Sequence, residues 1–357
     1  MSKIRYGLLL LTVSTIFLLA WGQQAPNIPM PGPRMPQPPP GSEGSQSTQD
    51  STPDEQPTAT FKARTDLVQV FFNVKDRKGG LIPNLTKDDF EIYEDGKPQT
   101  TKYFSANSDL PLTLGILIDA SASQTRVLES EKEVGGIFLQ DVLREKDEAF
   151  VLSFDVNVDL LQDFTNSTRL LKAALNRAKI NSGGGMYGGI PGIGQGPVPT
   201  ASRPRGTLLF DAVYLAGHDQ LSQQVGRKAM ILLTDGEDQG SQLRLRDAVE
   251  AAQKSDSICY VLLLADRDFY GGSYMGAGDM SKLTKETGGR MIEIGNKVDK
   301  LRDAFNQISS ELRSQYSISY TPTNLVHDGR FRKLEIKPKG EYKIQSRTGY
   351  FAPLEEK

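Results

Sequence analysis

Hydrophobic residues follow a period of two in the segment from residue 61 to residue 110. In "LVQVFFNV", residues 67–74, every second position after the leucine is apolar, which is typical of a half-buried strand. In "FEIYEDGKPQTTKYF", Asp95 and Gly96 separate two further strand-like runs, and this dipeptide indicates a hairpin turn. The segment therefore predicts a small group of antiparallel strands.

The pattern changes between residues 111 and 314. "LTLGILID" is an uninterrupted apolar run, as in a strand covered on both faces, whereas "SEKEVGGIFLQDVL" carries apolar residues at helical spacing. "EAFVLSF" and "VDLLQDF" follow closely enough to form a hairpin, and apolar strands then alternate with helices. This alternation predicts an α/β domain, a doubly wound, mostly parallel sheet with helices on both faces.

Residues 315–357 return to strand-like alternation in "YSISY", "FRKLEIKP" and "YKIQSRTGYF". Neither this segment nor residues 61–110 is long enough to bury a core alone. We expect them to form one small antiparallel β-sandwich, with the α/β domain inserted between its two halves.

The N-terminus has the features of a targeting segment. Two basic residues precede a short apolar stretch and small residues, which predicts a signal peptide over residues 1–22, an uncleaved anchor being the alternative. Residues 23–60 are rich in Pro, Ser and Gln and predict a disordered linker. We therefore expect export to the periplasm, the cell envelope or the medium, with no membrane span after cleavage.

Composition narrows the function classes. Hydrophobic residues make up 38% of the chain and charged residues 24%, with a formal net charge of −2, a balance that argues against nucleic acid as a partner. The single cysteine, Cys259, lies in the apolar run "SICYVLLLA" and is expected to be a core residue. A reactive or intermolecular thiol is the alternative in an exported protein.

Oxygen-bearing side chains follow the apolar strands of the α/β region. "DASAS" places Asp119, Ser121 and Ser123 at alternate positions, Asp235 ends "RKAMILLTD", and Thr207 begins the helix "TLLFDAVYLAGHDQL". Ligands bind outside the carboxyl ends of strands in open α/β sheets. Hydroxyl and carboxylate oxygens suit a hard cation such as Mg²⁺, which needs near-octahedral oxygen ligands at about 2.1 Å.

These residues resemble the metal-ion-dependent adhesion site of von Willebrand factor A domains. The resemblance covers about 200 residues, and the flanking segments look like a secreted bacterial group of related proteins described mainly from acidobacteria. It implies that Asp119, Ser121, Ser123, Thr207 and Asp235 bind Mg²⁺ or Mn²⁺. It also implies that a partner protein supplies an acidic side chain to the ion.

Each part of the pattern has a simpler interpretation. The "DASAS" run is compatible with a capped turn, Asp235-Gly236 with an ordinary turn, and Thr207 with a helix N-cap. Glu237 and Asp238 are expected to be solvated, and a supporting role for Asp238 behind the metal ligands is the alternative. The long glycine-rich loop at 181–206 is either disordered or a rim beside the metal, and aromatic residues at 265–279 are candidate contacts on the same edge.

Enzyme motifs are weak in this sequence. It has two histidines, His218 and His327, no H-E-x-x-H and no phosphate-binding G-x-x-x-x-G-K-[ST]. We therefore expect no catalytic residues and a non-catalytic exported protein that binds a partner through the cation. A scaffolding protein with a vestigial site is the alternative, and a metal-dependent hydrolase is a weaker one. The sequence leaves the oligomeric state open.

Overall fold

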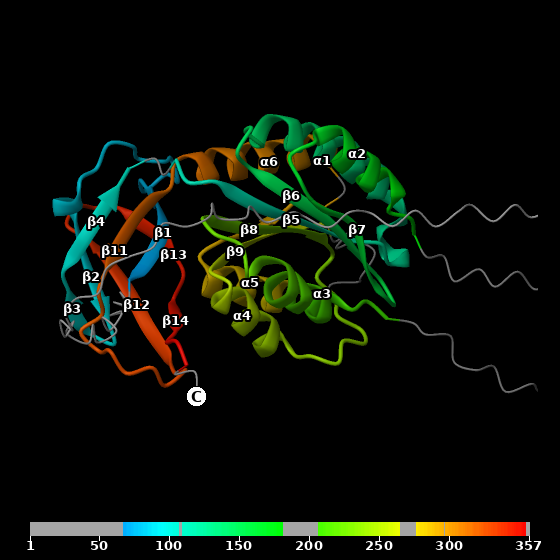
Figure 1. Cartoon of the computed structure of the whole chain (residues 1–357). Coiled ribbons are helices and arrows are strands. Elements are labelled where there is room, and N and C mark those ends of the chain that lie inside the picture. The colour runs from blue at the N-terminus through cyan, green and yellow to red at the C-terminus, as the bar shows by residue number, and fades with distance from the viewer. Residues whose placement is uncertain (1–66, 107–108, 181–205, 265–275, 296, 355–357) are drawn as a thin grey trace, which may run out of the picture. The chain divides into compact units, whose positions relative to one another are not determined.

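The computed structural model describes residues 67–106, 109–180, 206–264, 276–295 and 297–354 (Figure 1). The predicted signal peptide and linker lie outside these residues. So do the glycine-rich loop up to residue 205 and the aromatic segment from 265 to 275. Within the described residues, no helix combines the length and the apolar character needed to cross a membrane.

A six-stranded sheet forms the centre of the α/β region, in the order β10-β9-β8-β5-β6-β7. All neighbouring pairs are parallel except β6 and β7, which form the expected antiparallel hairpin. The strands are β5 (Leu112–Asp119), β6 (Glu148–Phe154), β7 (Val158–Thr165), β8 (Arg227–Thr234), β9 (Ser257–Leu263) and β10 (Met291–Glu293).

Three helices cover each face of this sheet (Figure 1). One face carries α1 (Leu128–Val142), α2 (Thr168–Arg177) and α6 (Val298–Arg313), and the other carries α3 (Leu209–Leu215), α4 (Leu245–Lys254) and α5 (Gly276–Thr287). A 3₁₀ turn η2 (Ala122–Arg126) precedes α1, and a π-helical segment η3 (Ala216–Leu221) extends α3. The predicted doubly wound α/β class is confirmed.

The apolar run of β5 explains its central place. All eight of its residues are buried, with Leu114, Ile116 and Ile118 packing under α1, α2 and α6, and Leu117 facing the other helices. A methyl group added at Gly115 would lie 2.5 Å from the ring of Phe150 on β6, so this position requires glycine. A strand covered on both faces holds its last residue, Asp119, in a rigid setting.

The remaining strands form two four-stranded antiparallel sheets that share one apolar core, as expected for the sandwich. Each sheet takes strands from both ends of the chain, in the orders β13-β1-β11-β4 and β14-β12-β2-β3. The N-terminal strands are β1 (Val68–Lys75), β2 (Phe90–Glu94), β3 (Lys97–Gln99) and β4 (Thr101–Ser105), with the 3₁₀ turn η1 (Lys87–Asp89) before β2. The C-terminal strands are β11 (Tyr316–Tyr320), β12 (Phe331–Pro338), β13 (Lys343–Ser346) and β14 (Gly349–Phe351).

A buried carboxylate joins the two halves of the sandwich core. Glu94 on β2 is 2% exposed and accepts hydrogen bonds from Tyr320 Oη at 2.7 Å and Tyr350 Oη at 2.9 Å.

The predicted hairpin joins β2 to β3, with Asp95 and Gly96 at φ 47° and 78°, the left-handed conformations that a two-residue turn of this kind needs.

Two elements differ from the sequence expectation. The run "SQLRLRDAVEAAQKS" has a helical pattern from Ser241 onward, but α4 begins at Leu245, because Asp211 accepts hydrogen bonds from the Gln242 and Leu243 amides and holds them outside the helix. The strand-like run after the hairpin turn is also divided, since β4 leaves β3 and pairs with β11 in the other sheet.

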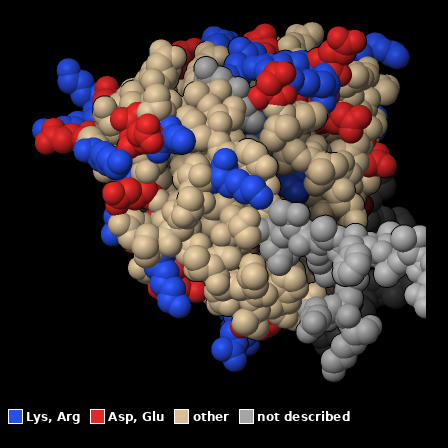
Figure 2. All heavy atoms as spheres, turned by 60° about the vertical axis from the view of Figure 1, so that its left-hand side comes forward, with Lys and Arg blue, Asp and Glu red and all other residues tan. Residues whose placement is uncertain are grey.

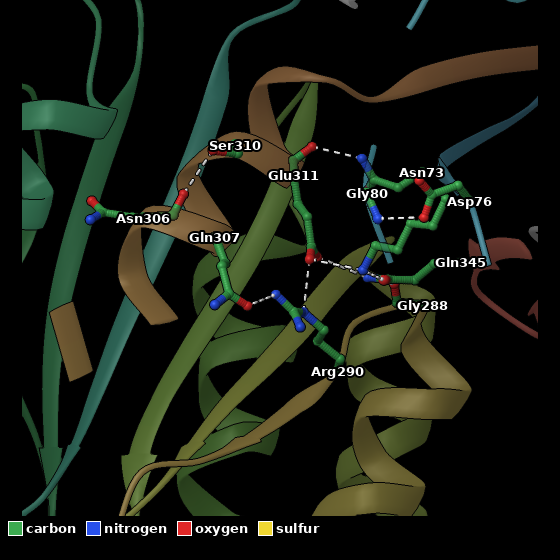
Figure 3. A network of polar contacts seen from close by, with 11 residues as sticks. Asn73, Asp76, Gly80, Gly288, Arg290, Asn306, Gln307, Ser310, Glu311 and Gln345 are labelled. Carbon is green, nitrogen blue, oxygen red and sulfur yellow. Dashed lines mark hydrogen bonds and ion pairs between the residues drawn. The ribbon is translucent and has the colours of Figure 1, made fainter. Parts of the chain in front are cut away.

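A second buried carboxylate, Glu311 on α6, joins the α/β region to the sandwich (Figure 3). Its side chain contacts Lys75 Nζ on β1 at 2.9 Å, Arg290 Nε at 2.7 Å and Gln345 Nε2 on β13 at 3.2 Å. Its backbone carbonyl accepts a hydrogen bond from Asn73 Nδ2 at 2.8 Å. One acidic side chain thus holds a helix against two strands of the neighbouring sheet.

Charged side chains of both signs share the surface in Figure 2, mostly toward its upper and left edges. Uncharged residues form most of the middle and lower part of that face, apart from a basic group near its centre and a few charged side chains at its lower edge. Neither sign dominates this face.

Replacing Glu311 by Gln should lower the free energy of unfolding by about 3 kcal/mol, because Lys75 and Arg290 would lose the carboxylate that compensates them. Urea unfolding measures the change. Glu341→Gln is the matched control, since Glu341 pairs with Arg77 in an exposed ion pair and should change stability by less than about 1 kcal/mol. Equal effects of the two substitutions would contradict this role of Glu311.

Candidate metal centre

Two carboxylates lie at the ends of neighbouring strands. Asp119 ends β5, and Asp235 follows Thr234, the last residue of the adjacent strand β8. Asp119 is fully buried and Asp235 is 2% exposed. The hydroxyl of Thr234 donates to Asp119 Oδ2 at 2.6 Å and accepts from the Gly236 amide at 2.9 Å, which fixes the two strand ends relative to each other.

The loop after Asp119 brings two hydroxyl groups to the same edge. The Ser121 amide donates to Asp119 Oδ1 at 2.9 Å, and the Oγ atoms of Ser121 and Ser123 lie 2.9 Å apart. Ser121 is the N-cap of η2, but its side chain caps no amide there. The serine hydroxyls are therefore directed to each other rather than used as caps.

Backbone contacts on both sides place Thr207 above β5. The carbonyl of Thr207 accepts a hydrogen bond at 3.0 Å from the amide of Gln239, which lies in the loop after β8. The amide of the next residue, Leu208, donates a hydrogen bond at 2.8 Å to the carbonyl of Asp155, which directly follows β6. Because β6 and β8 flank β5, this segment spans the carboxyl edge where Asp119 ends. Thr207 is 7% exposed, and the N-cap of α3 is Leu208, so the simple N-cap interpretation of Thr207 is wrong.

A clamp between the β8 loop and α3 fixes this arrangement. Asp238 Oδ1 accepts from the Phe210 amide at 3.2 Å and from the Ser241 hydroxyl, and Ser241 Oγ accepts from the amides of Phe210 and Asp211. The expectation of a solvated Asp238 was therefore wrong: it is half-buried and caps the first turn of α3. The clamp couples the position of Thr207 to that of Asp235.

Burial determines the electrostatics of the centre. Loss of hydration, followed by the nearby charge of Asp235, raises the pKa of Asp119 to about 7, although hydrogen bonds from Ser121 and Thr234 partly oppose the shift. Two buried carboxylates this close are stable together only if a proton or a cation neutralises part of their charge.

Three buried polar residues around the site were not identified from the sequence. Thr234 bridges the two strand ends, and Gln124 in η2 and Glu131 in α1 are each 1% exposed. Both side-chain polar atoms of Gln124 and both carboxylate oxygens of Glu131 lack a hydrogen-bond partner in the structure. Their sequence signal is weak, because "ASQTRVLESE" reads as a polar turn followed by an exposed helix start.

The donor set fits a hard divalent cation. Among the described residues, no three His, Cys, Asp or Glu side chains gather into a metal-binding group, so direct coordination has to draw on hydroxyls and water besides two carboxylates. The residues that meet this requirement are Asp119, Ser121, Ser123, Thr207 and Asp235. The cavity of about 590 Å³ between α4 and the C-terminal strands includes none of them.

No protein-family model matches the sequence, and neither does any curated protein. Similar solved structures include the conserved hypothetical protein BatB from Bacteroides thetaiotaomicron, at 20% identity over 56% of this chain and 97% of that one, with a TM-score of 0.41. A von Willebrand factor type A protein from Catenulispora acidiphila is 12% identical over 82% and 74% of the chains, with a TM-score of 0.44.

The proximal thread matrix protein 1 of the mussel byssus, described with a zinc-occupied MIDAS motif, is 13% identical over 62% of this chain and 50% of that one, at a TM-score of 0.44. The fold assignment depends on the strand order and on the helices that cover each face.

In EDTA, the free energy of unfolding should fall as the pH rises from about 4 to about 7. Over this window folded Asp119 retains a proton that the unfolded chain, with a carboxyl pKa of 3.8, has released, so this group alone lowers stability by about 1.4 kcal/mol per pH unit. Glu131 acts in the same direction, because burial raises its pKa.

Urea unfolding across this pH range measures the effect. In Asp119→Asn, the part of the fall in unfolding free energy with pH that is due to Asp119 should disappear. Asp159→Asn changes an exposed carboxylate on β7 and should leave the dependence of the unfolding free energy on pH unchanged. An unaltered slope in Asp119→Asn would show that Asp119 is ionised throughout.

Proposed function

We propose that this chain is an exported, non-catalytic binding protein of the von Willebrand factor A type, which holds a partner through Mg²⁺ or Mn²⁺. The observation that carries the proposal is the pair of buried carboxylates, Asp119 and Asp235, at the ends of adjacent strands β5 and β8. Hydroxyl groups from two other loops surround the same edge. This combination of few charges and several neutral oxygens suits a cation that keeps an open coordination position.

Each residue has a defined part in this centre. Asp119 and Asp235 would supply the negative charge, while Ser121, Ser123 and Thr207 would supply neutral oxygens. Thr234 holds the Asp119 carboxylate in place, and Asp238 holds the loop that carries Asp235. Two carboxylates balance the charge of a divalent ion without filling its coordination positions, so an open position would remain for an oxygen ligand from another molecule, such as an acidic side chain.

Two observations support a binding role rather than catalysis. Cys259, the one thiol, is fully buried in β9, and burial raises its pKa to about 12, so that it is protonated at neutral pH and a poor nucleophile. On the η3 segment, His218 Nδ1 lies 2.6 Å from Oδ1 of its neighbour Asp219, and the His218 ring stacks on Tyr214 of α3. Neither arrangement aligns a base with a nucleophile.

Metal binding is tested by calorimetry with Mg²⁺ and Mn²⁺. The wild-type protein should bind one ion per chain, and a concentration 100 times the dissociation constant should add about 2.7 kcal/mol to the free energy of unfolding. Asp119→Ala should lose both effects, and Asp159→Asn should keep them. Equal metal binding by wild type and Asp119→Ala would reject the site.

Partner capture is tested with immobilised protein and envelope extracts in Mg²⁺ or EDTA. The expected partner is retained in Mg²⁺, released by EDTA and lost with Asp119→Ala, because the ion links it to the chain. Asp159→Asn should retain it. A partner held equally well in EDTA would favour a scaffolding protein with a vestigial site.

A further inference from the structure

Glu131 is a buried carboxylate whose oxygens have no hydrogen-bond partner among the described residues. It lies in the first turn of α1, eight residues after Ser123, and its side chain is 1% exposed. Neither oxygen forms a hydrogen bond in the structure, although Lys132, the next residue, pairs with exposed Glu129. A buried, unpaired acidic group is strongly destabilising unless something outside the chain satisfies it.

The charges of the candidate metal centre act on Glu131. Its pKa lies well above the usual range, first because it is desolvated and then because the charges of Asp119 and Asp235 act on it. η2, which carries Ser123, leads directly into α1. The turn that supplies the serine hydroxyls therefore leads into the helix turn that carries Glu131, near enough for the charges of Asp119 and Asp235 to act on it.

A second unpartnered side chain accompanies it. Gln124, in η2 next to Ser123, is also 1% exposed, and neither its amide nitrogen nor its oxygen is hydrogen-bonded in the structure. Two such side chains, seven positions apart on the consecutive elements η2 and α1, are unusual, because most buried polar groups are satisfied. They indicate a shared polar group that the described residues do not provide.

We propose that Glu131 is a positioning residue of the metal centre, whose carboxylate accepts a hydrogen bond from water bound to the cation. The inference rests on the proposed metal binding. Gln124 supplies a donor and an acceptor to the same water. Glu131 acts through water because it forms no three-acid metal group with Asp119 and Asp235 among the described residues.

A protonated Glu131 with no role at the metal explains the missing hydrogen bonds of its side chain less well than an ionised Glu131 beside a bound cation. A neutral carboxyl group would still donate its O–H to an acceptor, and no such bond forms to the described part of the chain. An ionised carboxylate near a divalent ion is satisfied by attraction to the ion and by its bound water. Residues that orient metal ligands from outside in this way typically change metal affinity 10- to 100-fold.

The test compares Glu131→Gln with Glu129→Gln, which removes the same charge from an exposed position on the same helix turn. Calorimetry with Mn²⁺ should show affinity lowered at least about 10-fold for Glu131→Gln and changed less than about twofold for Glu129→Gln. Water-proton relaxation by bound Mn²⁺ should also change for Glu131→Gln alone, because the hydrogen bond acts on metal-bound water.

Stability in EDTA separates positioning from a structural role. Glu131→Gln, and Glu131→Leu as a second variant, should be at least as stable as wild type without metal, since they remove an uncompensated buried acid. Wild-type Mn²⁺ affinity in both variants would overturn the inference and leave the proposed function standing. Absence of Mn²⁺ binding by the wild-type protein would instead reject the proposed function.

Discussion

The parallel pairing of β5 between β6 and β8 is the constraint on which the candidate centre depends. Both edges of β5 are hydrogen-bonded and both faces are covered by helices, so its last residue cannot relax toward water. Asp119 is therefore held beside Asp235 without water, which is electrostatically unfavourable while both are charged. The clamp from Asp238 to the start of α3 extends this rigidity to the loop that carries Thr207. A cation entering such a site would meet ligands already held in place, which reduces the ordering entropy of binding.

Buried carboxylates also occur at the junction with the sandwich and inside the sandwich. Glu311 brings Lys75 and Arg290 together where the two regions meet, as Glu94 brings together two tyrosines inside the sandwich. In both places one carboxylate replaces its water with several fixed donors, which is what makes a buried acid tolerable. Glu131 stands apart from these two because its donors are missing from the described chain. That contrast, within one molecule, is the reason to look for its donor on a bound ligand.

Local patterns predicted much of this architecture. Strand-helix alternation indicated the doubly wound sheet, the alternation in "LVQVFFNV" indicated the half-buried β1, and Asp95-Gly96 indicated the hairpin. The resemblance to a known site drew attention to the five oxygen donors. The burial of Glu131, Gln124 and Glu311 could not be predicted, because a charged or amide side chain near a helix end is normally solvated. Their burial depends on which elements pack over them, and that is set by contacts distant in sequence. Asp238 was misjudged for the same reason.

The composition of the sandwich has a consequence for the order of folding. Glu94 and Tyr320, which share a hydrogen bond in its core, are 226 positions apart in the sequence. Closing so long a loop is slow unless the intervening chain is already compact. The paired residues Ser105 and Ser317 lie at the two ends of the inserted α/β region, so its folding brings the sandwich halves together. During synthesis, strands β1 to β4 therefore leave the ribosome before the C-terminal strands with which they pair, and their apolar faces stay uncovered until then. The α/β region acts as the folding template for the sandwich that encloses its ends.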